Sequence, residues 1–215
     1  MEPDYRKLLI MHTYFPRRVP FLNQRTLKTV FFYACLFELA SSGHLRVEDE
    51  KLIVDEKTTG DPVLDRVLEL VTPLSGSKIS KLQLLVQNKS PEVYRRQLEL
   101  MTEKNYITYD EVSFLFWPLY RKYRVVKQNL LKPSLRELEQ MLVYGRKPDY
   151  TVWKLALLAF EAGLYRNIFP SPEFRKRARC KTKELLKSAF HLEDKTIVAL
   201  HKSMRRTLMA QKASQ

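Results

Sequence analysis

The stretch that most constrains the fold of this chain is residues 30–40, which are apolar on nearly every side except at Glu38. A helix at the surface of a globular protein carries its apolar residues in one stripe, whereas a helix that is apolar all round is buried. The Ser41-Ser42-Gly43 sequence that follows supplies a stop, because glycine readily adopts the left-handed conformation that ends helices. We therefore expect residues 30–40 to form a helix that other helices enclose.

A short hairpin and a second helix are expected next. Residues 45–47 and 52–54 read as two short strands joined across Glu48-Asp49-Glu50. The helix after them is expected to begin at Asp61, whose carboxylate can accept hydrogen bonds from the free N–H groups of the first turn, with Pro62 where its missing N–H costs nothing. Its apolar stripe consists of Val63, Leu64, Val67, Leu68 and Val71, and Pro73 ends it.

Helical periodicity continues through the rest of the chain. It recurs at residues 78–86, 92–103, 133–142, 150–163, in the basic stretch 175–187 and at residues 197–208. Residues 150–163 are again apolar nearly all round, and we expect them to pack against residues 30–40. The predicted fold is mainly α: a single-domain helical bundle core with surrounding amphipathic helices and short β-hairpins. We expect a basic and aromatic arm at 1–29, the helical domain at 30–208 and a frayed tail at 209–215.

The net charge indicates the kind of partner. Lys and Arg total 38 against 24 Asp and Glu, which gives a formal net charge of +14 over 215 residues. Such a surplus points to an anionic partner, which is a membrane surface, a nucleic acid or an acidic protein. The sign of the charge alone does not choose among the three.

Cysteine usage and hydropathy set further limits. Cys35 and Cys180 form no secreted disulfide framework and lack metal-ligand spacing with histidine, so a reducing compartment is expected. The apolar runs at 8–11, 30–37 and 155–164 are shorter than the roughly 18 residues of a membrane-spanning helix. Any membrane association is therefore expected to be peripheral.

No pattern of catalytic or metal-binding residues emerges from the sequence. The four histidines, His12, His44, His191 and His201, include no pair at the i, i+4 spacing of a helical zinc site. With five glycines the chain has no phosphate-binding loop and no nucleophile elbow. Asp61 and Asp65 are interpreted as helix-capping residues rather than paired catalytic carboxylates. We expect a protein that is not an enzyme, without cofactor or metal.

The strongest surface candidate is an apolar segment inside a strand-like region. Residues 106–117 read as strands, with Asp110-Glu111 as the turn, and Pro118 is expected to limit the second strand. An apolar run followed by cations suits an anchor at the membrane interface, because the apolar side chains enter the acyl boundary while the cations stay with anionic headgroups. The predicted membrane hairpin comprises Phe114, Leu115, Phe116, Trp117, Pro118, Arg121 and Lys122. Packing of these residues on the core or in a dimer contact remains the alternative.

Several segments resemble the Golgi phosphoprotein 3 family of peripheral membrane proteins. The first match comprises Glu38-Leu39, Gly43, Leu45, Thr59-Gly60-Asp61-Pro62 and Leu64-Asp65; the second comprises Pro148-Asp149, Leu155-Ala156-Leu157-Leu158 and Ala162-Gly163-Leu164. The resemblance spans roughly residues 31–208. It implies a helical bundle with a projecting hairpin, binding of phosphatidylinositol 4-phosphate and, in Golgi members, capture of the cytosolic tails of glycosyltransferases. It also implies a cytoplasmic protein that is peripheral on a membrane, on the cytosolic face of the Golgi in a eukaryote.

The residues with which the family binds the lipid headgroup are not matched in this chain. Their positions are occupied here by Asn23, Phe32, Pro91 and Tyr94. The cations nearest these positions are Arg25, Lys28, Arg95 and Arg96, which we take as candidate headgroup residues from their charge and proximity. They support binding to anionic membranes in general, with phosphatidylinositol 4-phosphate or a similar acidic lipid as the expected ligand. Self-association through the hairpin is a further expectation.

A winged-helix nucleic-acid-binding protein is the alternative reading. Residues 78–86 and 92–103 followed by the strand pair have the order helix, helix, wing, and the basic surplus suits phosphates. The apolar run from Phe114 to Trp117 is poorly suited to lie along a duplex backbone. The carboxylates of Glu92, Glu99 and Glu103 dilute the charge of the candidate recognition helix.

Overall fold

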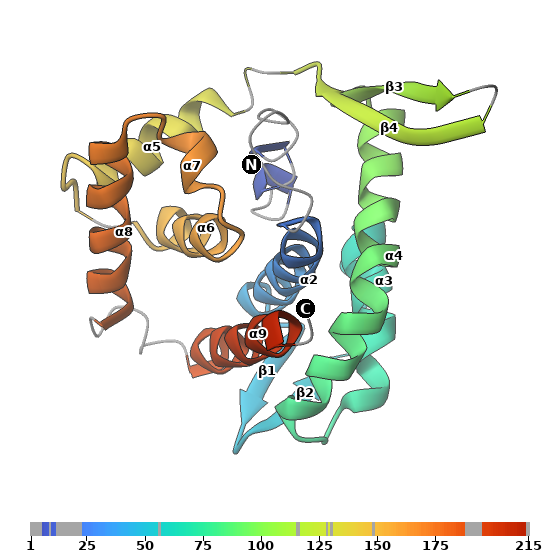
Figure 1. The fold of residues 1–215 in the computed structure, drawn as a ribbon. Helices are drawn as coiled ribbons and strands as arrows, with labels where there is room; N and C mark the ends of the chain where they lie inside the picture. Colours follow the sequence, from blue (N-terminus) through green and yellow to red (C-terminus); the bar gives the residue numbers. More distant parts are fainter. Residues whose placement is uncertain are drawn as a thin grey trace.

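The structure is a computed structural model, and it describes residues 6–8, 10–11, 23–55, 57–114, 117–127, 129, 131–147, 149–187 and 195–213. For residues 23, 113–114 and 117–122 only the backbone is described. The fold is mainly α, as predicted (Figure 1). The helices are α2 (Asn23–Ser41), α3 (Pro62–Val71), α4 (Leu82–Glu103), α5 (Lys132–Leu142), α6 (Tyr150–Glu161), α7 (Tyr165–Ile168), α8 (Pro172–Lys187) and α9 (Lys195–Ala213), with 3-10 turns η1 (Thr72–Leu74) and η2 (Ile79–Lys81). Two antiparallel hairpins complete the fold, β1 (Leu45–Glu48) with β2 (Lys51–Val54) and β3 (Ile107–Phe114) with β4 (Trp117–Val125).

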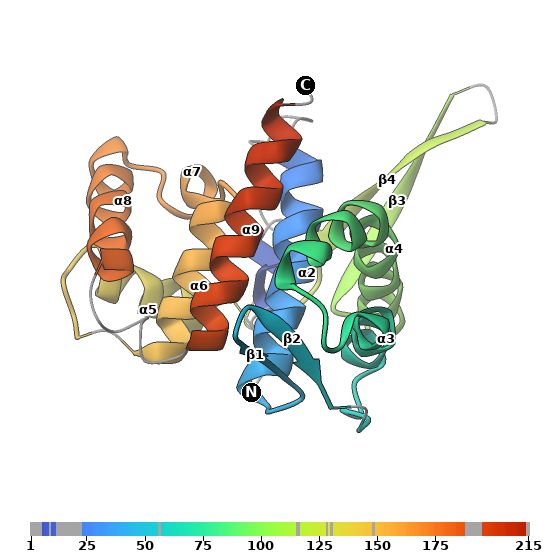
Figure 2. The same ribbon diagram turned by 90° about the horizontal axis from the view of Figure 1, so that it is seen from below.

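Helix α2 is the central element, and its burial confirms the prediction of an enclosed helix. Every residue from Val30 to Phe37 is at most 1% exposed. Helix α9 lies alongside α2 in the opposite direction, with α6 on one side and α3 and α4 on the other (Figure 2). The Phe31 ring meets the Tyr94 ring of α4 edge to face at 5.4 Å between centroids. At the other end of α2, Nζ of Lys154 in α6 donates to Ser41 Oγ at 2.8 Å, so α6 packs against α2 as expected.

Helix α2 begins earlier than the apolar run indicates. It starts at Asn23, so residues 23–29 of the predicted arm are the first turns of the central helix. Leu27 and Thr29 are buried in these turns, whereas Arg25 is exposed and Lys28 is half-buried. Because polar and charged residues interrupt the apolar pattern here, a prediction based on a continuous apolar run did not include these turns.

Helix α9 is also longer than predicted. Helix α9 runs to Ala213, so residues 209–213 of the predicted tail are part of this helix. Gln211 is 3% exposed and its Nε2 donates to Thr29 Oγ1 at 2.8 Å. This contact ties the last turns of α9 to the first turns of α2.

Residues 82–103 form one helix instead of two. Pro91 lies inside α4, although proline is favoured in the first turn of a helix and the sequence indicated a new helix there. Val86 and Ser90 before the proline share one buried face with Val93 and Gln97 after it. The burial of this continuous face offsets the hydrogen bond that Pro91 cannot make. The helix-turn-helix geometry behind the nucleic-acid alternative is therefore absent from α4.

The β1–β2 hairpin is fastened to its neighbours. Its two-residue connection, Asp49 and Glu50, has φ angles of 47° and 59°, as a type I′ turn requires. On the open side of β2, Leu52 N donates to Ser77 O at 2.9 Å and Ile79 N donates to Glu50 O at 2.8 Å. On β1, Val47 N donates to Oγ1 of Thr196 in α9 at 3.1 Å.

The turn of the second hairpin was predicted in the wrong place. Asp110 and Glu111 lie inside β3, paired with Lys122 and Arg121 of β4, and the pairing continues as far as Phe114 and Trp117. Opposite charges directly across an antiparallel pair favour this register. Pro118 does not end β4 either. It lies opposite Ser113 beside a register shift between Val112 and Ser113, and a bulge in an edge strand is where a sheet tolerates proline.

Candidate functional site

The β3–β4 hairpin projects from the helical body in both views (Figures 1 and 2). Its base is held to α4 by a hydrogen bond from Tyr106 N to Met101 O at 2.9 Å. Further out, an ion pair joins Arg124 to Asp110 across the strands, and the Tyr109 and Tyr123 rings lie 5.7 Å apart between centroids. The base is therefore bonded to the end of α4, polar and aromatic contacts join the two strands to each other, and the distal end extends beyond the body.

The predicted membrane segment lies at this distal end. Phe114 of β3 and Trp117 of β4 are the last paired residues of the hairpin, and Leu115 and Phe116 lie outside the described residues. Pro118, Arg121 and Lys122 follow in β4, where the backbone alone is described. The register thus brings the ends of the apolar run together at the tip, with the two cations further down the hairpin.

The four candidate headgroup cations lie on two neighbouring helices. Arg25 and Lys28 are in the first turns of α2, and Arg95 and Arg96 are in the C-terminal half of α4. Lys28 precedes Phe31 by about one helical turn, and Phe31 contacts Tyr94, the residue before Arg95. Arg25, Arg95 and Arg96 are exposed and Lys28 is half-buried.

Arg95 and Arg96 leave α4 in different directions. Successive residues of an α-helix point about 100° apart. Arg96 follows Glu92 by four positions, so it lies on the flank of α4 that faces α3, whereas Arg95 lies on the flank that continues from Tyr94. Helical geometry therefore places Arg95 nearer than Arg96 to the contact between α4 and α2.

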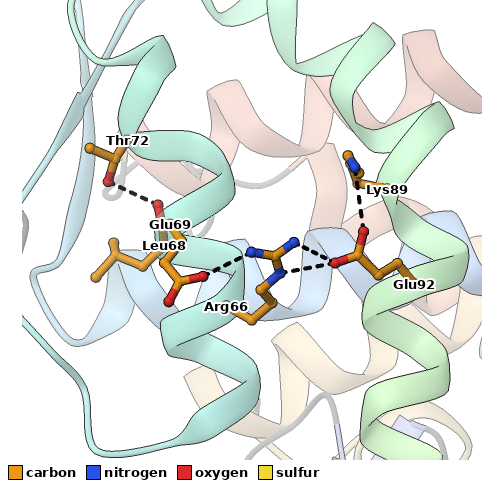
Figure 3. Close-up of polar contacts among 6 residues, drawn as sticks. All are labelled: Arg66, Leu68, Glu69, Thr72, Lys89 and Glu92. Carbon is orange, nitrogen blue, oxygen red and sulfur yellow. Dashed lines mark hydrogen bonds and ion pairs between the residues drawn. The ribbon is translucent and has the colours of Figure 1, made fainter.

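On the flank of α4 that faces α3, two further cations form ion pairs in a polar network (Figure 3). Arg66 donates to Glu92 Oε1 from Nε at 2.9 Å and from Nη2 at 2.6 Å, and from Nη1 to Glu69 Oε2 at 2.9 Å. Lys89 Nζ donates to Glu92 Oε2 at 3.4 Å. The hydrogen bonds from Arg66 hold the pKa of the Glu92 carboxyl below its usual range. Arg66 thus bridges α3 and α4, Lys89 pairs within α4, and both cations are engaged with carboxylates.

Helix α8 carries a stripe of exposed cations. The sequence analysis identified this helix as basic but did not distinguish these cations from the others on it. Lys176, Arg179, Lys183 and Lys187 recur at i, i+3, i+7 and i+11 and are all exposed. Neighbouring Arg177 and Lys181 instead pair with Glu173 at 2.6 Å and Glu184 at 3.1 Å. The helical spacing of the four cations was the signal that could have identified the stripe.

The motif from Thr59 to Asp65 is structural. Asp61 Oδ1 accepts from Val63 N at 2.9 Å and from Leu64 N at 3.3 Å, which makes it the N-cap of α3, as predicted. Asp65 Oδ1 accepts from the backbone N–H of Thr59 at 2.6 Å and from its hydroxyl at 2.7 Å. Asp61 also forms an ion pair with Arg6, which fastens the N-terminal segment to α3.

Within the described part of the chain, no three histidine, cysteine, aspartate or glutamate side chains gather as metal ligands would. Burial raises the pKa of the Cys35 thiol well above its usual value, so this cysteine is not activated as a nucleophile. Among the same residues, no helix is both long enough and apolar enough to cross a bilayer.

An enclosed central helix, with a bundle around it and a two-stranded hairpin that extends beyond it, defines a class of mainly helical proteins. Within that class, the family model of Golgi phosphoprotein 3 (GPP34) matches residues 7–208. The chain belongs to this Golgi-associated family. A search of curated proteins found no match.

Proposed function

We propose that this protein is a peripheral membrane adaptor that binds anionic lipid headgroups through a basic surface and an apolar hairpin. Membership of the Golgi phosphoprotein 3 family supports a Golgi-phosphoprotein-like role in general. Phosphatidylinositol 4-phosphate, or a similar acidic lipid, is the proposed ligand. Recruitment of the cytosolic tails of membrane enzymes is the proposed adaptor role, on the cytosolic face of the Golgi in a eukaryote.

The projecting β3–β4 hairpin carries this proposal. Its last pair consists of Phe114 and Trp117, the first and last residues of the apolar run, so this run begins and ends at the distal end of the hairpin. A membrane anchor needs apolar side chains that reach beyond the polar body, and a hairpin fixed at its base meets that need. Complete burial of one such side chain contributes about 1.5 to 3 kcal/mol, and interfacial depth yields part of it.

The positive charge supplies the second component of binding. The formal net charge is +14, and each Lys or Arg close to an anionic leaflet contributes about 1 kcal/mol. Arg25, Lys28, Arg95 and Arg96 are the proposed headgroup ligands because they lie nearest the positions where the family's own ligands are absent. Several cations acting together with a partly inserted tip suffice for reversible attachment.

Vesicle flotation tests the proposal. Neutral, phosphatidylserine and phosphatidylinositol 4-phosphate vesicles are compared at low and high salt, with duplex DNA as competitor. We expect flotation with the two anionic compositions, with a steep loss as salt screens the charges. Equal flotation with neutral and anionic vesicles at low salt, or complete displacement by DNA, would contradict the proposal.

A further inference from the structure

A groove of about 460 Å³ lies on the opposite side of the molecule from the β3–β4 hairpin. Three segments line it: Val47, Asp49 and Glu50 of the first hairpin; Ile79 and Ser80 of η2 with Gln83 of α4; and one face of α9. In Figure 1 the β1–β2 hairpin lies at the bottom of the view and β3–β4 at the top. The volume is within the range of sites that bind small ligands or short peptides.

Helix α9 gives the groove a basic wall. Lys195, Lys202 and Arg206 recur at i, i+7 and i+11, so they lie along one face of the helix. All three are exposed, and none of them forms an ion pair within the described residues. From Lys195 to Arg206 the stripe extends about 16 Å, which corresponds to roughly five residues of extended peptide.

The groove also has apolar and acidic parts. Val47, Ile79, Val198 and Ala199 are half-buried or buried and supply its apolar lining. Asp49 and Glu50 of the β1–β2 turn add two carboxylates to the lining. The groove therefore combines three cations, all on α9, with two carboxylates, both on the hairpin. The cationic side of the groove is the face of α9.

The turn that bears the two carboxylates is itself unusual. Asp49 and Glu50 both adopt positive φ, a conformation that residues other than glycine seldom adopt. The hydrogen bond from Ile79 N to Glu50 O and the one from Leu52 N to Ser77 O hold the turn in place. The two carboxylates are therefore carried by a turn that is bonded to its neighbours.

We propose that this groove binds a short acidic peptide segment of a soluble protein partner, with apolar side chains toward the floor and carboxylates toward Lys202 and Arg206. A cation of the segment complements Asp49 and Glu50 on the hairpin side of the groove. A flat lipid surface suits a projecting tip better than a concave site that includes carboxylates. A free phosphate would use one or two of the three aligned cations and none of the apolar lining.

Fluorescence anisotropy with a labelled peptide of sequence Lys-Ser-Leu-Ser-Glu-Leu-Glu-Glu tests the proposal on the full chain. We expect saturable binding, which weakens at least tenfold when every Glu of the peptide is replaced by Gln. Replacing Lys202→Glu and Arg206→Glu together should also weaken binding at least tenfold. The milder pair Lys202→Gln and Arg206→Gln should give a smaller loss and serves if the charge reversal fails to fold.

A matched control separates the groove from the overall charge. Lys176→Glu with Lys183→Glu on α8 changes the net charge by the same amount, and both residues are exposed and distant in sequence from the groove. We expect this control to keep the affinity of the parent chain for the peptide. An equal loss in the α8 control, equal affinity for the Gln peptide, or no loss in the Lys202 and Arg206 variants would overturn the proposal.

The test also distinguishes the groove from the proposed lipid surface. The Lys202 and Arg206 variants should float with anionic vesicles as the α8 control does. Inorganic phosphate should fail to displace the peptide except at concentrations that act as salt. Displacement by low phosphate, or loss of vesicle binding confined to the Lys202 and Arg206 variants, would identify the groove as an anion or lipid site instead.

Discussion

The hydroxyl of Tyr33 on α2 lies 2.8 Å from Oγ of Ser203 on α9, although 170 positions of the sequence separate the two residues. The same hydroxyl lies 3.0 Å from Oγ1 of Thr207, one helical turn further along α9. Tyr33 and Thr207 are fully buried and Ser203 is 5% exposed. Together with the bond from Gln211 to Thr29, this pairing fixes how α9 lies on the central helix.

Tyr33→Phe should lower the free energy of unfolding by about 1 kcal/mol, because it removes the hydroxyl that bonds Ser203 Oγ, whereas Thr207 Oγ1 still donates to the backbone carbonyl of Ser203. Urea denaturation followed by circular dichroism measures the change. Tyr144→Phe is the matched control, since Tyr144 is 58% exposed, and it should leave stability nearly unchanged. Equal effects of the two substitutions would show that the Tyr33 hydroxyl does not stabilise the α2–α9 contact.

Alkaline pH should destabilise the fold through buried tyrosines. Burial raises the pKa of Tyr33, Tyr94 and Tyr165, so the folded state favours their neutral forms. Unfolded tyrosine ionises at a pKa of about 10. The stability that these groups contribute is therefore complete below pH 10 and is lost as the pH rises through their folded pKa values.

Absorbance of phenolate near 295 nm, followed together with far-ultraviolet circular dichroism, checks this pH dependence. The chain has 11 tyrosines, and we expect the last three to ionise only as helical signal is lost. Ionisation of all of them in a chain that keeps its full helical signal would contradict the assignment.

The tip of the β3–β4 hairpin should enter the bilayer interface. The chain has only two tryptophans, and Trp153 is 1% exposed in α6, so each serves as a reporter once the other is replaced. In Trp153→Phe, the emission of Trp117 should shift blue and be quenched by brominated anionic lipids. In Trp117→Phe, the emission of Trp153 should remain unquenched. Vesicle binding without quenching of Trp117 would limit attachment to electrostatics.

Headgroup preference should depend on Arg25, Lys28, Arg95 and Arg96. Replacing all four by Ala should abolish any preference for phosphatidylinositol 4-phosphate over phosphatidylserine while the chain remains folded. The control replaces Lys176, Arg179, Lys183 and Lys187 of α8 by Ala, which removes the same charge. It should weaken binding to both vesicles and retain the preference. An unchanged preference in the first variant would place the headgroup site elsewhere.

Apolar pattern predicted the core well because burial follows directly from it. Residues 30–40 and 150–163 were identified as enclosed, and α2 and α6 fill those roles. The prolines, in contrast, led to wrong predictions of where elements begin and end. Pro91 and Pro118 indicated boundaries, yet one lies inside α4 and the other in β4, because packing on both sides of Pro91 and a bulge beside Pro118 accommodate them.

The surfaces were less predictable than the core. The α8 stripe could have been found from its helical spacing, since all its members lie on one element. The groove could not, because Val47, Ile79 and Lys202 come from distant parts of the chain and their proximity depends on how α9 lies against the first hairpin. The net charge predicts an anionic partner, but it gives no information about which cations already form ion pairs within the protein. Arg66 and Lys89 are two such paired cations.

The bond from Gln211 to Thr29 joins residues 182 positions apart, so α9 covers a helix that is synthesised long before it. During translation, the apolar surface of α2 has no α9 to cover it until residues 195–213 have left the ribosome. Contacts of such long sequence separation slow folding, and exposed apolar surface in an incomplete chain promotes aggregation. Ribosome-bound chains that end before α9 should therefore remain protease-sensitive and depend on chaperones.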